Sequence, residues 1–150
     1  MKKKEIENLI KEKEEYFLGW QREKANFINY KNQEFERLKG TLSIAKESLF
    51  EEIIPILDSF ELAKRSIPEE KKEDSSVKGL LLIKKQLEES LKGLGLEEIE
   101  SINKKFDPNF HEIIEEVENK EPGIIVEEVQ KGYSYQGKIL RTSKVKVGKY

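Results

Sequence analysis

The chain has 150 residues, of which 39% are charged, with a formal net charge of -2 at pH 7, no cysteine and a single histidine. The missing cysteines exclude disulfide scaffolds, thiolate metal sites and thiol nucleophiles, and the single histidine removes most imidazole chemistry. The longest strongly apolar run, residues 80–83, is far too short to span a bilayer. We therefore expect a cytoplasmic protein that is not an enzyme and that has no metal site and no cofactor.

A ladder of apolar residues at eleven-residue spacing marks the first part of the chain. It consists of Tyr16, Phe27, Leu38, Leu49 and Phe60. Eleven residues over three turns give about 3.67 residues per turn, close to a straight α-helix, so the pattern predicts one long helix over residues 5–64. Because the neighbouring residues are largely Lys, Glu, Asn and Gln, the ladder has no cover in its own chain. We expect a second copy to supply it, as a parallel helical dimer.

Apolar positions become denser from Leu38 onward, where they step by three or four residues. Phe50, Ile54 and Leu57 widen this stripe, and Pro55 is expected to bend the helix or to mark a change of packing partner. A stripe of this width suits a helical bundle better than a two-helix seam. The residues expected in the bundle are Leu38, Leu42, Leu49, Ile53, Ile56 and Phe60.

A second, shorter helix is predicted after a charged loop at residues 66–76. Ser75 or Ser76 is the expected N-cap, and the helix should run over residues 77–92 and end at the glycines that follow. Its apolar positions Leu80, Ile83 and Leu87 follow helical spacing. One hairpin of two helices closes a core poorly, whereas two hairpins form a four-helix bundle, which we expect at the dimer contact.

The last third of the chain changes to short β-rich segments. A helix start is expected at residues 106–112, with Asp107 as N-cap, Pro108 at the first helical position and His111 packed one turn further on. Strands are predicted at residues 113–117, 124–129, 133–135, 138–140 and 145–147, with a hairpin turn at residues 136–137. The expected fold is α+β, with a dimer stalk at residues 1–40, a helical hairpin at 41–103 and a β-domain at 104–150.

Charges in the last third are segregated along the sequence. Eleven acidic residues and three lysines lie between residues 97 and 128, whereas residues 129–150 hold six basic residues and no acidic one. The basic residues are Lys131, Lys138, Arg141, Lys144, Lys146 and Lys149. Two interpretations remain open at this point: acidic and basic strands pair within one sheet, or the basic residues form a face for an acidic partner.

Residues 132–138 match the first seven positions of a P-loop, the glycine-rich phosphate-binding segment of many nucleotide enzymes. Ile139, however, stands where the Mg²⁺-binding Ser or Thr is required, and a strand rather than a helix is predicted to follow. We therefore expect no nucleotide-binding loop here.

Three short motifs follow one another in the last third of the chain: residues 106–112 (FDPNFHE), 129–133 (VQKGY) and 137–141 (GKILR). In this order they resemble the GrpE family of nucleotide exchange factors, with Phe106, Asp107, Pro108 and His111 as the structural part of the first motif. Upstream, residues 21–30 resemble the long-helix segment of that family, residues 53–58 its apolar-proline-apolar-aspartate bundle motif, and residues 77–80 the start of its second bundle helix.

This resemblance implies a homodimer that binds the ATPase domain of a DnaK-type chaperone through a β-domain and promotes the release of ADP, in protein folding and the heat-shock response. It also implies roles for individual residues. Val129 is the expected apolar contact, Lys138 and Arg141 are the expected charged contacts, and Gly132 and Gly137 set strand and turn geometry. Gly79 is expected to let helices approach closely in the bundle.

A different class of function remains as the alternative, namely a coiled-coil protein whose basic β-module binds nucleic acid. Its support is the set of six basic residues together with Tyr133 and Tyr135. Alternation along strands divides these residues between two faces, and a net charge of -2 gives little long-range attraction to a polyanion. We therefore expect neither a nucleic-acid partner nor a membrane partner.

Overall fold

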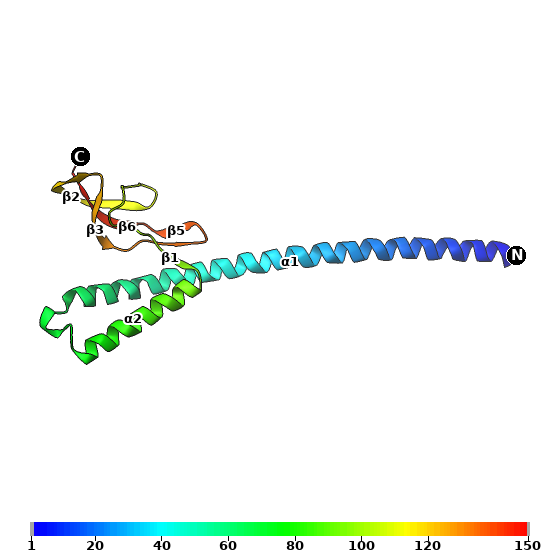
Figure 1. The fold of residues 1–150 in the computed structure, drawn as a ribbon. Coiled ribbons are helices and arrows are strands. Elements are labelled where there is room, and N and C mark those ends of the chain that lie inside the picture. Colours follow the sequence, from blue (N-terminus) through cyan, green and yellow to red (C-terminus); the bar gives the residue numbers. More distant parts are fainter. Residues whose placement is uncertain (1, 150) are drawn as a thin grey trace. The chain divides into compact units, whose positions relative to one another are not determined.

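The computed structural model describes residues 2–149 and has an α+β architecture, with a long N-terminal helix, a second helix and a C-terminal group of strands (Figure 1). The fold class predicted from the sequence is thereby confirmed. By its internal contacts the chain divides into two compact units, Met1–Ala45 and Lys46–Tyr150.

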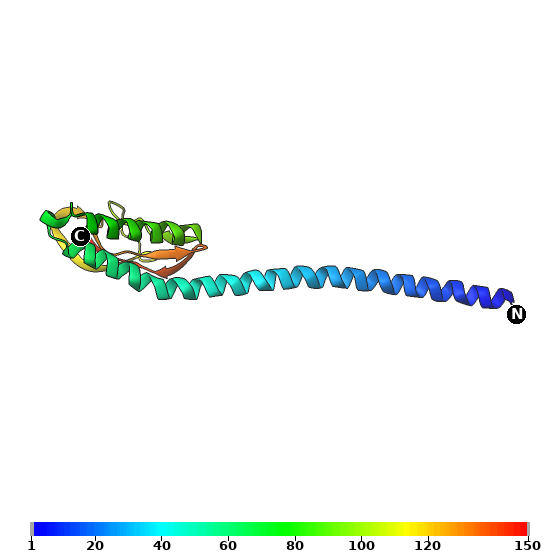
Figure 2. The ribbon, with the colours of Figure 1, turned by 90° about the horizontal axis from the view of Figure 1, so that it is seen from below.

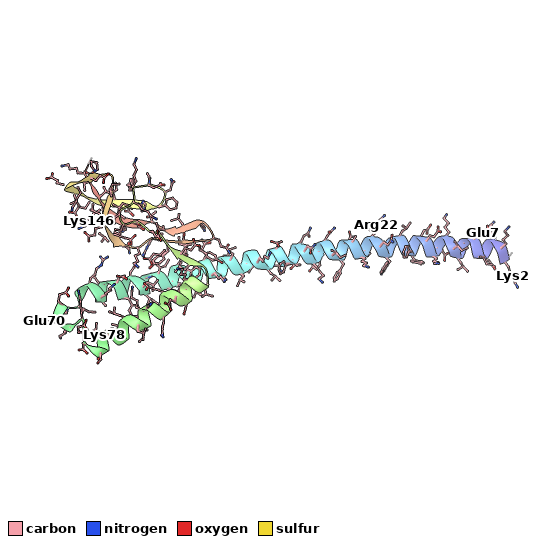
Figure 3. The ribbon with its side chains drawn as sticks, viewed as in Figure 1. Lys2, Glu7, Arg22, Glu70, Lys78 and Lys146 are labelled. Atoms are coloured by element: carbon pink, nitrogen blue, oxygen red, sulfur yellow. The ribbon has the colours of Figure 1, made fainter. Side chains whose placement is uncertain are left out.

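The first unit consists of one helical segment. Helix α1 extends over Lys2–Ser66, close to the predicted range, and it continues through Gly19 and Gly40. Figure 3 shows Glu7 and Arg22 projecting from this bare segment. The ladder residues Tyr16 and Phe27 expose more than half of their surface, because this unit offers nothing else to pack against them.

In the second unit, the end of α1 and helix α2 (Ser75–Gly93) run antiparallel as a hairpin, joined by a connection that contains the 3-10 helix η1 (Glu69–Lys71) (Figures 1 and 2). Helix α1 continues through Pro55 without a break. The expected change of packing partner comes earlier, at Phe50, where the buried residues of the helix begin. Asp74 is the N-cap of α2, since its side chain accepts a hydrogen bond from the Ser76 backbone N–H at 3.1 Å. The cap expected at Ser75 or Ser76 was therefore placed too late.

Within the described residues, six strands form two three-stranded sheets. They are β1 (Leu96–Glu98), β2 (His111–Pro122), β3 (Ile125–Gln130), β4 (Tyr133–Tyr135), β5 (Lys138–Arg141) and β6 (Ser143–Gly148). The first sheet has the order β1-β4-β5 and is antiparallel throughout. The second has the order β2-β6-β3, in which β6 runs parallel to β2 and antiparallel to β3. The sequence predicted five of these strands and missed β1.

Each sheet contributes to a separate hydrophobic core. The first core joins both helices to the β1-β4-β5 sheet and contains Phe50, Ile54, Leu57, Leu91, Leu96, Tyr133 and Tyr135. The second core lies within the β2-β6-β3 sheet and is built on Ile125, Val145 and Val147, with Phe106 and Ile113 packed against it. The β1-β4-β5 sheet is thus the part of the β-module that is fastened to the helices.

The helix expected at residues 106–112 is absent, and this prediction was wrong. Asp107 does act as a cap, because its carboxylate accepts hydrogen bonds from the backbone and side chain of Asn109, both at 2.9 Å. The bonds close a turn over residues 108–110, and His111 then opens strand β2, opposite Ser143 of β6. An aspartate whose carboxylate accepts a hydrogen bond from the backbone N–H two residues ahead occurs both in Asx turns and at helix starts. The local sequence pattern is therefore the same for both.

Acidic and basic strands pair with each other in the second sheet, as the first interpretation of the charge pattern required. Lys146 on the central strand β6 forms ion pairs with Glu115 of β2 at 2.9 Å and with Glu127 of β3 at 3.2 Å. Figure 3 labels this lysine on the β-module. Within residues 2–149, neither helix has the combination of length and apolarity that a bilayer-spanning segment requires.

Candidate functional site

The β1-β4-β5 sheet is held on one face of α1 by aromatic and aliphatic packing. Phe50 meets Tyr135 edge to face, with ring centroids 5.2 Å apart and planes inclined by 67°. Ile54 and Leu57, one and two turns further along the helix, are buried in the same core together with Tyr133. Burial raises the pKa of the Tyr133 hydroxyl above its ordinary value, and neighbouring carboxylates add to this effect. Tyr133 therefore stays neutral and serves packing.

Three carboxylates of α1 border this apolar patch, and each is paired with a cation of the β-module. Glu47 pairs with Lys138 at the start of β5, and Asp58 pairs with Arg141 at the end of β5 at 2.5 Å. Glu61 lies 4.0 Å from Lys131, the residue after β3, which also pairs with Glu98 of β1. An apolar centre with charged pairs at its margin is an arrangement that fixes orientation as well as contact.

Lys84 connects α2 to the same face of α1. Only 6% of this residue is exposed, and its ammonium group lies between Glu61 of α1 and Glu88 of α2. Burial alone would disfavour the charge, but hydrogen bonds and charge from the two carboxylates outweigh it and raise the pKa of Lys84. A charged lysine between two helices requires both partners, so it fixes how the hairpin closes.

The β4-β5 hairpin carries both cations that were predicted to contact a chaperone, Lys138 and Arg141. Tyr135 pairs directly with Lys138, which leaves a two-residue loop, and both loop residues have positive φ, 50° at Gln136 and 77° at Gly137. These are the features of a type I′ turn, and the hairpin turn predicted at residues 136–137 is confirmed. The Lys138 side chain is 66% exposed even though it pairs with Glu47. It therefore remains accessible to a partner.

Gly132 is required by close packing between strands. A Cβ at this position would lie 2.5 Å from the Ser143 backbone nitrogen and 2.8 Å from the Ile99 side chain. The Gly132 N–H donates to the Ser143 hydroxyl oxygen at 2.9 Å, and that hydroxyl lies 2.8 Å from the hydroxyl of Ser101. Val129, on β3, is only half-buried. Gly132 thus sets strand geometry, whereas Val129 is available for contact.

The structure places Arg141 differently from the other expected contact residues. Its guanidinium group bonds both Asp58 and the Lys131 carbonyl oxygen, and only 24% of the side chain is exposed. A direct contact with a chaperone would have to compete with these internal bonds.

The residues predicted for the dimer bundle fall into two groups. Those in the first are exposed and have no apolar cover: Leu38, Leu42, Leu49, Ile56, Leu80 and Ile83. Those in the second, Ile53, Phe60 and Leu87, are half-buried, and Ile53 and Leu87 pack against the first core. A Cβ at Gly79 would meet nothing within 4 Å, so the surface of α2 is open there to a close approach.

Residues 106–111 form a locked turn rather than a contact surface. The Asp107 N–H donates to Nδ1 of His111 at 3.0 Å, and the rings of Phe106 and Phe110 flank the imidazole. Burial lowers the pKa of His111, although Asp107 and Glu128 oppose the shift. Nε2 of His111 is buried without a hydrogen-bond partner among the described residues. The histidine is therefore a neutral part of the fold, as a packing role predicts.

The segment that imitates a P-loop is a strand, a turn and a strand. Residues 133–135 and 138–141 are the paired strands β4 and β5, and no helix follows them. The strand predicted after the turn is confirmed. Among residues 2–149, no group of three or more His, Asp and Glu side chains is arranged to hold a metal ion.

Sequence reasoning did not identify the partners of the basic residues. Asp58 was noted only as part of the motif at residues 53–58, and Glu47, Glu61 and Lys84 were not singled out. A signal existed, because the carboxylates at positions 47, 58 and 61 lie three, four, seven, eight or eleven residues from Phe50 and Ile54 and so share their helical face.

Comparison with known proteins identifies the family. The sequence model described as GrpE matches residues 1–149. The chain belongs to the GrpE family. A relative named Protein GrpE, from Bacillus subtilis (strain 168), is 34% identical over 145 residues, which cover 95% of this chain and 76% of the relative. Another Protein GrpE, from Oceanobacillus iheyensis, is 34% identical over 148 residues, which cover 97% of this chain and 77% of the relative. The Bacillus pumilus protein is 36% identical over 128 residues, with 84% and 69% covered. The GrpE assignment made from the motifs is confirmed, and with it the co-chaperone class.

Proposed function

We propose that this GrpE-family protein is a cytoplasmic nucleotide exchange factor that binds the ATPase domain of a DnaK-type chaperone and promotes the release of ADP. The observation that carries this proposal is the β4-β5 hairpin, which is docked on α1 and presents the exposed cation Lys138 directly after its turn. We include the half-buried Val129 of β3 in the proposed contact surface, while Gly132 and Gly137 shape the backbone of the β-module.

The proposed mechanism is thermodynamic coupling and needs no catalytic residue. If the β-module binds a form of the chaperone with an open nucleotide cleft more tightly than a closed form, it shifts the population toward the open form. By linkage, the protein then weakens the binding of ADP to the chaperone by the same factor by which ADP weakens the binding of the protein. A rigid module that selects one shape of its partner is sufficient for this activity.

A homodimer is part of the proposal. In the first unit the ladder residues are exposed, and in the second unit Ile56, Leu80 and Ile83 are exposed on the helical hairpin. Large apolar surfaces of this extent are normally covered by a partner. We propose that a second copy covers them, through a helical stalk and a four-helix bundle.

The nucleic-acid alternative has little support from the charges. Of the six basic residues between positions 129 and 149, all except Lys144 form ion pairs with carboxylates of the described chain. Cations that are already paired release few counterions when a polyanion binds. This is a reason to prefer a specific protein partner.

The experiment is a nucleotide-release assay with a DnaK-type chaperone loaded with a fluorescent ADP and chased with excess unlabelled ATP. We expect the protein to accelerate release, and Lys138→Glu to weaken the acceleration because it removes the accessible cation and places a like charge beside Glu47. Rising salt should have the same effect on the wild type.

Lys71→Glu is the matched control, since Lys71 is an exposed lysine of η1, outside the β-module, and the change in charge is identical. Unchanged release on adding the wild-type protein, together with tight and salt-sensitive binding to RNA or DNA, would favour the nucleic-acid alternative instead.

A further inference from the structure

Asp58 lies at the centre of a polar clamp between α1 and the β-module. Its Oδ2 accepts a hydrogen bond from Nη1 of Arg141 at 2.5 Å, and its Oδ1 accepts one from Nη2 of Arg141 at 2.8 Å. The Gln130 side-chain amide donates a third bond to Oδ2 at 2.9 Å. A two-pronged contact between a carboxylate and a guanidinium group restrains rotation as well as distance, which a single ion pair does not.

Arg141 is held from its other side by the backbone. Its Nε and Nη2 both donate to the Lys131 carbonyl oxygen, at 3.1 and 2.6 Å, and its guanidinium carbon lies 5.6 Å from the centroid of the Tyr133 ring. Every nitrogen of the guanidinium group therefore has a partner inside the chain. Such a group is committed to structure, in contrast to the exposed Lys138.

The clamp lies at one end of the strand that carries Lys138. Arg141 is the last residue of β5 and Lys138 is the first, and β5 is an edge strand of the β1-β4-β5 sheet. One edge of β5 pairs with β4, so the orientation of β5 against the helix depends on Leu140, which packs on the core, and on the ion pairs at its two ends. The pair at Lys138 is exposed, and the clamp at Asp58 is the more enclosed and more highly bonded of the two.

We propose that Asp58 is a positioning residue of the chaperone-binding surface: it grips Arg141 and so holds β5 on α1 in the orientation in which Lys138 meets the chaperone. The inference rests on the proposed function. It assigns Arg141 to the interior of the protein rather than to direct contact with the partner. It also explains the aspartate of the motif at residues 53–58 by its contact with the β-module rather than by packing in the helical bundle.

A quantitative consequence follows for the exchange reaction. If the clamp is loosened, only a fraction of molecules presents β5 correctly, and the apparent affinity for the chaperone falls by that fraction. At saturation every bound molecule has the correct orientation, so the maximal release rate is unchanged. A loss of stability alone would move neither quantity at a temperature well below unfolding.

The test is a titration of fluorescent-ADP release from the chaperone against the concentration of this protein, at 25 °C, with folding of each variant verified by circular dichroism. For Asp58→Asn we expect a half-saturating concentration about three- to tenfold higher than that of the wild type, at the same maximal rate, in line with the loss of one partly buried charge pair. Asp58→Glu keeps the carboxylate and should recover most of the affinity, which also tests the inference if Asp58→Asn does not fold.

A double-mutant cycle separates positioning from direct contact. Arg141→Lys keeps the positive charge but loses the two-pronged grip, so under the proposal it behaves like Asp58→Asn, and the double variant is no worse than either single variant. Glu36→Gln is the matched control, because Glu36 is an α1 carboxylate in an exposed pair with Lys39.

Three results would overturn the inference. A lower half-saturating concentration for Asp58→Asn would mean that Asp58 competes with the chaperone for Arg141, and additive effects of the two substitutions would mean that Arg141 acts independently. Wild-type affinity for Asp58→Asn would equally reject the positioning role. Failure of the wild-type protein to accelerate release is a separate outcome, which rejects the proposed function itself.

Discussion

Truncation of Leu57 should undermine the attachment of the β1-β4-β5 sheet to α1. Leu57 is 1% exposed and packs in the core that joins both helices to this sheet. Leu57→Ala removes buried methyl and methylene groups and leaves a cavity, at a cost of about 2–5 kcal/mol. Against a typical domain stability of about 5–15 kcal/mol this is a large part of the total. At about 5 °C per kcal/mol for a unit of this size, Tm should fall by roughly 10–25 °C.

Urea unfolding followed by near-UV circular dichroism measures this effect, because the immobilised rings of Tyr133 and Tyr135 report on the same core. All samples need one protomer concentration, since dimerisation contributes to stability by mass action. Leu62→Ala is the matched control on the same helix, and its side chain is 68% exposed, so its effect should stay within about 0.5 kcal/mol. Equal losses of stability in the two variants would refute the assignment of the buried face of α1.

Three further predictions follow from other parts of the molecule. Gly132→Ala should lower the free energy of unfolding by about 1–3 kcal/mol, because its Cβ would strike the Ser143 backbone. Gly137→Ala has free space for a Cβ but a φ of 77°, so it should cost about 1 kcal/mol. Urea midpoints compare the two variants, and a larger loss at Gly137 would contradict the close packing at Gly132. Burial lowers the pKa of His111 below its ordinary value, so its contribution to stability is complete above about pH 6.5 and declines as the pH falls through the folded-state pKa. Since the chain has one histidine, His111→Asn should flatten the dependence of the unfolding free energy on pH in this range. An unaltered dependence would assign it to other groups. Light scattering coupled to size exclusion should give twice 17.6 kDa, and a monomer at micromolar concentration would count against the proposed role of the ladder.

Periodicity was sufficient to predict the helices and the hairpin. The repeat of apolar residues in α1 and α2 depends on helical geometry alone, and the turn at Gln136 and Gly137 depends on local backbone preference. Strand β1 was missed because its three residues, Leu96–Glu98, are too few to show alternation and are ordered by pairing with β4, far along the sequence. Tertiary pairing of this kind leaves no local signal.

The division of α1 into two apolar faces also required the structure. Phe50, Ile54 and Leu57 lie beside Leu49, Ile53 and Ile56 in the sequence, so a single widened stripe described them equally well. The structure buries the first set beneath the sheet and leaves Leu49 and Ile56 exposed. Periodicity shows how wide an apolar surface is, but not how many partners share it.

Candidate contact residues were predicted from motifs, and the motif does not distinguish inward from outward cations. Lys138 and Arg141 both belong to the segment at residues 137–141, yet the first is exposed and the second is enclosed by Asp58 and Lys131. The difference arises from their partners on α1, which are distant in the sequence: Glu47 is 91 residues from Lys138, and Asp58 is 83 residues from Arg141.

The most direct test of the proposed function is the affinity of this protein for the ATPase domain of a DnaK-type chaperone, measured with and without saturating ADP. Linkage requires that ADP weaken the binding of this protein to the chaperone by the same factor by which this protein weakens the binding of ADP. We therefore predict a clearly higher Kd for the protein in the presence of ADP. The ratio of the ADP affinities measured without and with the protein should equal the ratio of these Kd values. Equal Kd values in the two conditions would contradict the proposal that this protein exchanges nucleotide by selecting an open form of its partner.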